Sequence, residues 1–349
     1  MTIEAGHALV NLRDVEEAAR GRLDPVYCDY FASGAQDEIT VAANEAAFRR
    51  RVLIPRVLRG GGPPRLRTDV LGQAASMPVL IAPTAFHRLA CPEAEVATAR
   101  AAAAADVIMM AAMLSTVTIE EIAATGAKLW FQLYIQPDLT FTESLVRRAE
   151  AAGCRALVIT VDSPALGRNE RGDRNDFHDL PPGIACANMR GDGNVRQVVL
   201  SPEISWWHVD WLRRTTTLPL LLKGVLHPAD ARIAVEHGAD GLIVSNHGGR
   251  QLDTTPATLD RLGPIADVVG GRLPLLLDGG VRRGTDIAKA LALGARAVAV
   301  GRPVLWGLAA AGEAGVTRVL ELLRGELTNA LALLGAGSPA DLSRDQVDP

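Results

Sequence analysis

Short apolar runs recur along the chain, and each ends at polar or glycine-rich residues before a stretch with helical spacing begins. Such runs are typical of buried parallel strands that are followed by crossover helices. The pattern predicts eight strands, at Val79–Ala82, Val107–Met110, Trp130–Tyr134, Ala156–Val161, Leu220–Lys223, Gly241–Ser245, Pro274–Asp278 and Ala297–Val300. Eight alternating strands and helices predict an α/β fold, the (β/α)8 or TIM barrel.

The spacing of these strands departs from the regular pattern at one place. Successive strands begin roughly 20 to 35 residues apart, as strand–helix–strand units require, except for the fourth and fifth. Between these two we expect a lid-like insertion at residues 163–205, because its sequence is polar and marked by Gly and Pro. The insertion runs into an apparent helix, which we expect Trp206, Trp207 and Trp211 to anchor in the core.

The remaining segments frame the barrel. Residues 1–75 form an N-terminal helical segment in which Val15–Arg22 and Glu38–Arg51 have helical spacing, and we expect these helices to close the bottom of the barrel or to reach over its rim. A final helix is expected after Leu308. We therefore predict one domain over residues 1–349.

Composition and charge exclude several classes of protein. With 48% hydrophobic and 22% charged residues, the chain has the profile of a compact globular protein. A net charge of −4 disfavours nucleic acid and anionic membranes as partners. The four cysteines form no CxxC pair, which predicts no metal site and fits a reducing compartment. No secretion signal or membrane span is recognisable, so we expect a soluble, cytoplasmic protein.

Candidate chemistry lies at the ends of the predicted strands, where barrel enzymes carry their active sites. Two neighbouring strand ends are rich in glycine, Asp278–Gly284 and Val300–Pro303, and they carry Arg282 and Arg302. Exposed backbone amides, a helix N-terminus and arginine side chains suit a phosphate group. The alternative is that the glycines serve only tight turns.

Other strand ends carry acid–base groups. His247 and Arg250 suit a substrate that is a carboxylic acid and loses a proton, although both could simply be solvated. Lys223 ends a buried strand and needs an anionic partner. Asp162 could orient His247, and a Lys223–Asp162 ion pair is the alternative. The Tyr134 hydroxyl could bind a substrate oxygen, with core packing as the alternative.

Several segments together resemble the FMN-dependent 2-hydroxy acid oxidase and dehydrogenase family, which includes glycolate oxidase, lactate oxidase, and mandelate oxidase and dehydrogenase. The resemblance covers nearly the whole chain. It is carried by DYFASGAQDE, IAPTAFHRLACPEAE, FQLYIQ, ITVDSPALG, LLKGV, SNHGGRQLD, DGGVRRGTDIAKALALGA and VGRPVLWGLAAAGEAGV.

What the resemblance implies is an FMN-binding barrel. The isoalloxazine and ribityl parts would be held by Pro83, Thr84, Ala85, Gln132, Thr160, Lys223 and Ser245. The phosphate end would be held by Asp278, Gly280, Arg282, Gly301 and Arg302. The resemblance also implies that Lys223 stabilises negative charge at N1 and O2 of the reduced flavin.

The same resemblance implies roles at the substrate. His247 is the expected base with Asp162 as its partner, and Tyr134 is expected to bond the substrate hydroxyl. Arg250 and Tyr30 are the expected clamp for the substrate carboxylate, although packing is the simplest physical interpretation of Tyr30. Whether the electrons move as a hydride or after deprotonation at Cα stays open.

Three positions depart from the family pattern. Asn169 takes the place of an active-site Arg, and Arg168 or Arg171 could swing in instead. Ala112 stands where glycolate oxidases carry a Ser that contacts the flavin. Leu114 stands where they carry a Trp, which favours a substrate with a larger side chain than glycolate, such as the aromatic side chain of mandelate.

We therefore expect an FMN-dependent (S)-2-hydroxy acid oxidase that produces a 2-oxo acid and hydrogen peroxide from O2. One alternative is a dehydrogenase of the same family that uses another electron acceptor. Another is a non-redox barrel enzyme that acts on a phosphorylated substrate, and a third is a flavin-binding protein with little turnover. The insertion carries no recognisable membrane anchor, which favours the oxidase. The resemblance also implies a homotetramer or a larger oligomer.

Overall fold

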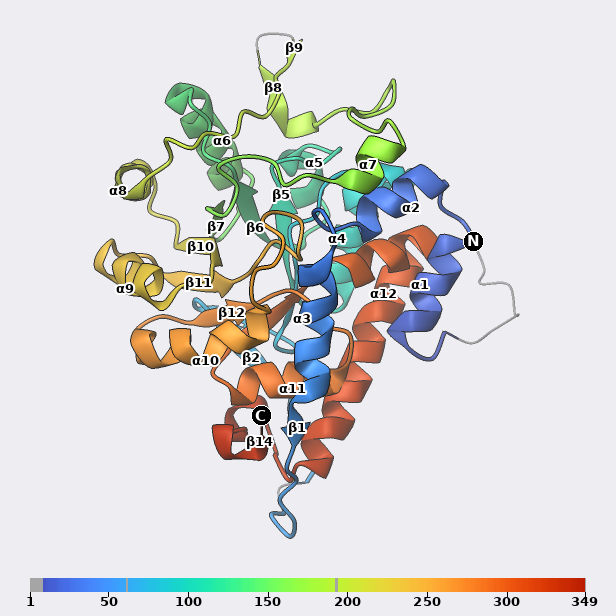
Figure 1. Cartoon of the computed structure of the whole chain (residues 1–349), viewed down its shortest axis with the longest axis vertical. Coiled ribbons are helices and arrows are strands. Elements are labelled where there is room, and N and C mark those ends of the chain that lie inside the picture. The colour runs from blue at the N-terminus through green and yellow to red at the C-terminus, as the bar shows by residue number, and fades with distance from the viewer. Residues whose placement is uncertain (1–8, 61, 192–193, 349) are drawn as a thin grey trace.

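Within residues 9–60, 62–191 and 194–348, which the computed structural model describes, eight parallel strands close into a barrel surrounded by helices (Figure 1). The predicted (β/α)8 fold is confirmed. The strands follow one another around the ring in chain order, and the last pairs with the first. They are β4 (Val79–Ile81), β5 (Ile108–Ala112), β6 (Lys128–Leu133), β7 (Leu157–Thr160), β10 (Leu220–Val225), β11 (Gly241–Val244), β12 (Leu275–Leu277) and β13 (Ala297–Val300).

All eight predicted strands are present, and only their ends differ. β5 continues through Ala111 and Ala112, which pair with Phe131 and Gln132 of β6. Alanine has little preference for strands, so this extension comes from the neighbouring strand and not from local sequence. The pairing places Ala112 and Gln132 side by side at the end of the barrel where the strands terminate.

A hairpin closes the opposite end of the barrel. It consists of β2 (Thr68–Val70) and β3 (Gln73–Ala75), which pair in antiparallel fashion. Val70 is fully buried against residues of the barrel interior, and the Gln73 side chain accepts a hydrogen bond from the Trp130 indole at 2.8 Å. Of the two alternatives expected for the N-terminal helices, closing the bottom is wrong, because this hairpin does so; α3 (Ile39–Arg50) instead lies against Gly249 and Gly280 at the rim.

The ring of helices surrounds the strands and buries their outer faces (Figure 1). Its members are α4 (Ala94–Ala104), α5 (Ile119–Ala123), α6 (Leu139–Ala151), α8 (Trp206–Thr215), α9 (Pro228–Glu236), α10 (Thr258–Val269), α11 (Gly284–Ala292) and α12 (Arg302–Leu333). α12 begins earlier than the predicted last helix, and it breaks at Ala311 and Gly312, whose backbone angles are not helical.

Three helices precede the barrel: α1 (Leu12–Arg20), α2 (Pro25–Ala32) and α3 (Ile39–Arg50). α1 packs along α12, and a short pair of strands, β1 (Val52–Leu53) and β14 (Val347–Asp348), joins the segment that follows α3 to the C-terminal segment (Figure 1). α1 and α3 correspond to the predicted helices, whereas α2 was not predicted. α2 brings Tyr30 to the end of the barrel where the candidate chemistry lies.

The insertion lies between β7 and β10. It contains α7 (Glu170–Arg174), a short 3-10 turn (Ala187–Met189) and a hairpin of β8 (Arg190–Gly191) and β9 (Asn194–Val195), which projects at the top of Figure 1. The predicted helix after it is α8, but Trp207 is 52% exposed, so the expectation that all three tryptophans lie in the core is wrong. Residues 192–193 of the insertion and residues 1–8 of the predicted N-terminal segment lie outside the described residues.

Two whole-chain expectations concern membranes and metals. Among the described residues, no helix is both long enough and apolar enough to cross a bilayer. In the same residues, no group of three or more His, Cys, Asp or Glu side chains is arranged to hold a metal ion.

Candidate active site

A cavity of about 900 Å³ opens where the barrel strands end. This volume lies at the upper end of the range typical of ligand pockets. Its walls come from three parts of the chain: the strand ends, α2 with the turn that follows it, and the insertion. Most of the predicted site residues line this cavity. They are Tyr30, Pro83, Thr84, Ala85, Leu114, Gln132, Tyr134, Lys223, His247, Arg250, Asp278, Gly280, Arg282, Gly301 and Arg302.

Arg302 begins α12 at one side of the cavity. Its guanidinium donates to the backbone carbonyls of Phe31 at 3.1 Å, Gly248 at 2.9 Å and Ser33 at 2.8 Å. Burial and, to a smaller extent, the neighbouring cations of Arg250 and Arg282 lower the pKa of Arg302 to about 9. A group of cations in this environment is stabilised by an anion placed between them.

Glycines shape the same side of the cavity. Gly280 follows β12 with φ of +85°, and a Cβ atom there would lie 2.5 Å from the carbonyl oxygen of Asn44 in α3. Only glycine fits this combination of backbone angle and close approach. Arg282 is placed two residues later, with its guanidinium 3.1 Å from Glu45.

Lys223 is buried, with only 4% of the residue exposed. Its ammonium donates to the Ser245 hydroxyl at 3.0 Å and lies 3.4 Å from Oδ2 of Asp278. The ion-pair partner of Lys223 is therefore Asp278, and the alternative of a Lys223–Asp162 pair is wrong. The other carboxylate oxygen of Asp278, Oδ1, is buried and has no hydrogen-bond partner among the described residues.

His247 lies between an acid and a phenol. Its Nδ1 is 2.9 Å from Oδ1 of Asp162, and its Nε2 is 3.4 Å from the Tyr134 hydroxyl. Burial opposes ionisation of Asp162, but the charge and hydrogen bond of His247 and the charge of Lys223 outweigh it and lower the pKa of Asp162. With Asp162 ionised, Nδ1 is the donor, and Nε2 is left to accept a proton.

The backbone at His247 is also unusual. Its φ is +59°, in the left-handed region that only a few per cent of non-glycine residues adopt. Such conformations persist where the surrounding structure holds them, and they cluster at functional sites. Glycines at the next two positions, Gly248 and Gly249, share positive φ values and let the chain pass close to Arg302 and α3.

The two tyrosines and Arg250 form another wall. Burial raises the pKa of both Tyr30 and Tyr134, so each hydroxyl keeps its proton. The Arg250 guanidinium lies 5.0 Å from the centre of the Tyr30 ring. It donates to the carbonyls of Tyr30 at 2.8 Å and Ser33 at 2.9 Å, which fixes its orientation.

Two predicted cofactor residues lie behind the wall of the cavity. Thr160 accepts a hydrogen bond from the Gln132 amide at 3.0 Å, and Ser245 holds Lys223 as described. Gln132 also accepts from the backbone N–H of Met113 at 3.2 Å. These side chains fix residues that line the cavity.

The structure does not bring Arg168 to the site. Its side chain is 72% exposed, and its Nε lies 3.4 Å from Asp173. Arg171 also points elsewhere, into an ion-pair network described below. Asn169, by contrast, lines the cavity.

Sequence reasoning missed further residues around the cavity. Phe177, Ile184 and Val198 of the insertion line it, and no periodic pattern in that segment indicated them. His87 is buried behind Thr84: its Nε2 lies 2.7 Å from the Thr84 hydroxyl and its Nδ1 3.0 Å from that of Thr98. Burial lowers the pKa of His87 and favours its neutral form.

Comparisons with known proteins agree with this architecture. A family model described as FMN-dependent dehydrogenase matches residues 19–349. An L-lactate oxidase of Nostoc sp. is 48% identical over 95% of this chain and 96% of its own length. A glycolate oxidase of Spinacia oleracea is 45% identical over 97% of this chain and 95% of its own. A solved structure of mandelate oxidase with benzoyl-formic acid has a TM-score of 0.92 and 44% identity, and the match covers 97% of this chain and 98% of that one.

Proposed function

Because the chain belongs to the FMN-dependent 2-hydroxy acid oxidase family, we propose that it oxidises an (S)-2-hydroxy acid with a medium-sized or aromatic side chain. The product is the 2-oxo acid. The two electrons and two protons removed from the substrate pass to O2, which becomes hydrogen peroxide. FMN is the cofactor.

The residues around the cavity fit FMN. The unpartnered Oδ1 of Asp278 suits a hydroxyl donor such as those of the ribityl chain. The cations of Arg282 and Arg302 beside the Gly280 turn suit the phosphate. Lys223, with Ser245 and Gln132 near it, supplies a fixed positive charge deeper in the cavity. When bound, FMN supplies the acceptor for the two electrons.

The substrate carboxylate binds at Arg250 in this proposal. A guanidinium offers a planar pair of donors that matches a carboxylate, and Arg250 is held in place by the carbonyls of Tyr30 and Ser33. The protonated Tyr30 hydroxyl is a second donor. The protonated Tyr134 hydroxyl, beside His247, is the group placed to bond the substrate oxygen that becomes the carbonyl.

His247 accepts the proton at Nε2. The positive charge that develops on its ring is stabilised by Asp162 on the opposite nitrogen. The side chain of the substrate is expected to lie against Leu114, Phe177, Ile184 and Val198, which give the cavity an apolar wall. That wall supports a substrate larger than glycolate.

One observation carries the proposal: His247, whose Nδ1 is held by the ionised Asp162, and the fixed guanidinium of Arg250 line one cavity with the groups that fit FMN. A proton acceptor and a carboxylate binder at the same cavity are what oxidation of a 2-hydroxy acid requires.

The test is anaerobic reduction of the bound flavin by glycolate and by single enantiomers of lactate, mandelate and a longer aliphatic 2-hydroxy acid. We expect (S)-mandelate or the longer acid to bleach the flavin fastest and glycolate to be slow. Failure of every acid to bleach it would contradict the proposal. On admission of air we expect rapid recovery of the yellow colour with peroxide formation, whereas slow recovery in air and fast recovery with an artificial acceptor would favour the dehydrogenase.

We also propose a homotetramer or larger assembly in the cytoplasm. The family resemblance supports the assembly, and the free thiols of Cys28, Cys91, Cys154 and Cys186 support a reducing compartment. Light scattering of the FMN-loaded protein tests the assembly, and a monomer would contradict it.

A further inference from the structure

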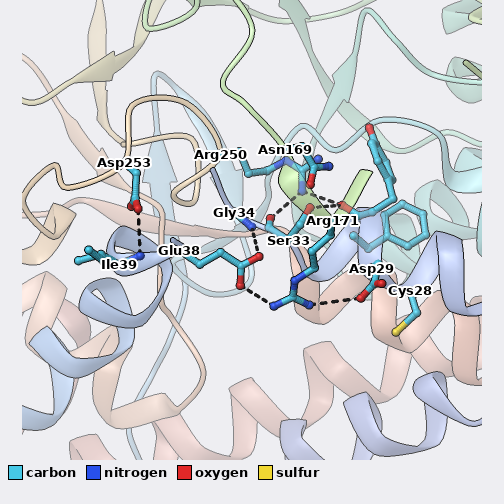
Figure 2. A network of polar contacts seen from close by, with 12 residues as sticks. Cys28, Asp29, Ser33, Gly34, Glu38, Ile39, Asn169, Arg171, Arg250 and Asp253 are labelled. Carbon is cyan, nitrogen blue, oxygen red and sulfur yellow. Dashed lines mark hydrogen bonds and ion pairs between the residues drawn. The ribbon is translucent and has the colours of Figure 1, made fainter. Parts of the chain in front are cut away.

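Arg171, on α7 of the insertion, lies between two carboxylates of the N-terminal segment (Figure 2). Its Nη1 is 3.4 Å from Oδ1 of Asp29 in α2, and its Nη2 is 2.5 Å from Oε2 of Glu38, the residue before α3. The side chains are only partly exposed, at 35% for Arg171, 39% for Asp29 and 21% for Glu38. We call these three residues the clasp.

Each carboxylate of the clasp belongs to a stretch of backbone that holds Arg250. Asp29 directly precedes Tyr30, whose carbonyl accepts from Arg250 at 2.8 Å. Glu38 accepts the backbone N–H of Gly34 at 3.2 Å, and the adjacent Ser33 carbonyl accepts from Arg250 at 2.9 Å. Both carboxylates of the clasp are therefore linked, through the backbone carbonyls of Tyr30 and Ser33, to the Arg250 guanidinium.

The turn between α2 and Glu38 packs closely against the loop that carries Arg250. A Cβ atom on Gly34 would lie 2.9 Å from the carbonyl oxygen of Gly249, which directly precedes Arg250. The Ala35 N–H donates to the same carbonyl at 2.8 Å, and the Gln36 N–H donates to the carbonyl of Arg168 in the insertion at 2.9 Å. A shift of this turn is thus passed to the Arg250 loop.

The clasp also places residues of the insertion that face the cavity. Asn175 donates to Oδ2 of Asp29 at 2.9 Å, and the Phe177 ring packs edge-on against Tyr30 at 5.3 Å. Asn169 accepts the N–H of Gly172 at 3.1 Å and so caps the helix that carries Arg171. Phe177 and Asn169 both line the cavity, so the position of α7 sets part of its wall.

We propose that Arg171 is a positioning residue for carboxylate recognition, which acts through Asp29 and Glu38 on the orientation of Arg250. This proposal rests on the proposed function, in which Arg250 binds the substrate carboxylate. Arg171 forms ion pairs with Asp29 and Glu38, so it does not replace the arginine that the family carries at position 169. The neutral Asn169 then leaves Arg250 as the main cation for the carboxylate.

The experiment compares two ligands on the FMN-loaded protein. Benzoylformate carries a carboxylate, and benzoylformamide is its neutral amide of similar size. The binding of each can be followed by perturbation of the flavin absorption spectrum. For Arg171→Met we expect benzoylformate to bind about tenfold more weakly, the effect of losing about 1.4 kcal/mol of coupling, and the amide to bind as before. An equal loss for both ligands would indicate a merely structural role and overturn the proposal.

Arg174 supplies the matched control. It lies on the same helix, its guanidinium is 2.8 Å from Glu170 of that helix, and its side chain is 71% exposed. Arg174→Met removes the same charge from α7 but leaves the clasp intact, so we expect both dissociation constants to stay within twofold of the parent protein. A loss of benzoylformate affinity equal to that of Arg171→Met would also overturn the proposal.

Glu38→Gln separates position from charge. Removing a negative charge near the site would tighten carboxylate binding if the clasp acted only through its field. A positioning role predicts weaker benzoylformate binding, and no further loss when Glu38→Gln is added to Arg171→Met. Tighter binding in Glu38→Gln would refute the proposal, and Arg171→Lys should recover part of the affinity through its pair with Glu38.

The outcomes also separate this proposal from the proposed function. If no 2-hydroxy acid reduces the flavin of the parent protein while benzoylformate binding still depends on Arg171, the proposed function fails and the positioning role stands. If the flavin is reduced but Arg171→Met leaves benzoylformate binding unchanged, only the positioning role fails. Should Arg171→Met not fold, Glu38→Gln and Arg171→Lys test the same coupling.

Discussion

His247 and His237 each pair with an aspartate, but of these two only His247 lines the cavity. His247 pairs with Asp162 and lines the cavity, whereas His237 pairs with Asp210 at 2.7 Å and stacks on Trp206 at the surface. Residue chemistry is the same in both pairs. Location decides which pair meets a substrate.

We expect His247→Ala to keep FMN bound and to slow anaerobic flavin reduction about 10²- to 10⁴-fold, because proton transfer is lost. Stopped-flow absorbance with the fastest acid of the panel measures this. His237→Ala is the matched control and should reduce at the parent rate. Undiminished reduction in His247→Ala would remove the base assignment.

His87 gives a prediction about pH. Burial lowers the pKa of His87 below its usual value of 6.5. Below pH 6.5, His87 is therefore protonated in the unfolded chain but still neutral in the folded protein. Stability contributed by neutral His87 is therefore complete above about pH 6.5 and declines as the pH falls toward the lowered folded pKa, by at most about 1.4 kcal/mol per pH unit.

Urea unfolding of the parent protein and of His87→Gln at pH 7.5 and 5.5 checks this prediction. The parent should lose more stability between the two pH values than the variant does, whatever their difference at pH 7.5. Equal losses would contradict it.

At the scale of elements, the turn between β12 and α11 depends on its distance from α3. Gly280 needs both its positive φ and the absence of a Cβ, because the Asn44 carbonyl lies in the way. Gly271, in the turn after α10, has φ of +74° but open space around its Cβ position. Comparing Gly271 with Gly280 therefore distinguishes the cost of a positive φ from the cost of a clash with α3.

Gly271→Ala should therefore cost only the strain of a left-handed alanine, about 1–2 kcal/mol. Gly280→Ala should cost more than that and weaken FMN binding, because α3 must move away from the phosphate side of the cavity. Thermal unfolding and titration with FMN measure both effects. Equal destabilisation of the two variants, with FMN affinity unchanged, would contradict this account.

Element by element, local patterns predicted the strands and most helices of the ring but not α2 or the hairpin of β2 and β3. The stretch Pro25–Ala32 is apolar or aromatic at every position except Asp29, so it shows no amphipathic helical pattern. Gln73–Ala75 is rich in alanine and short, so nothing in it favours a strand. Both elements are stabilised by packing against an end of the barrel, which is a tertiary interaction.

For the whole molecule, the gathering of Arg250, Arg282 and Arg302 around one cavity carries a cost in the FMN-free protein. Burial is the main cause of the lowered pKa of Arg302, and the like charges of Arg250 and Arg282 lower it in the same direction. An anion between them relieves this repulsion. Ligand binding to the folded state then stabilises the entire barrel, by about 2.7 kcal/mol when its concentration is a hundred times the dissociation constant.

We expect inorganic phosphate to raise the melting temperature of FMN-free protein above that in chloride at equal ionic strength, and FMN to raise it further. Riboflavin, which lacks the phosphate, should raise it less than FMN does. Arg302→Met should lose most of the response to phosphate. A phosphate effect no larger than that of chloride would contradict the anion site.

By itself the sequence determined the barrel and the set of polar residues at the strand ends, because both follow from local alternation of apolar runs and helices. Only the tertiary structure decided how those residues pair: Lys223 with Asp278 and not Asp162, and Arg171 with Asp29 and Glu38 while Arg168 faces solvent. These choices depend on the distance between segments that lie far apart in the chain. No local pattern encodes that distance, since it is set by how the packed elements close around the barrel.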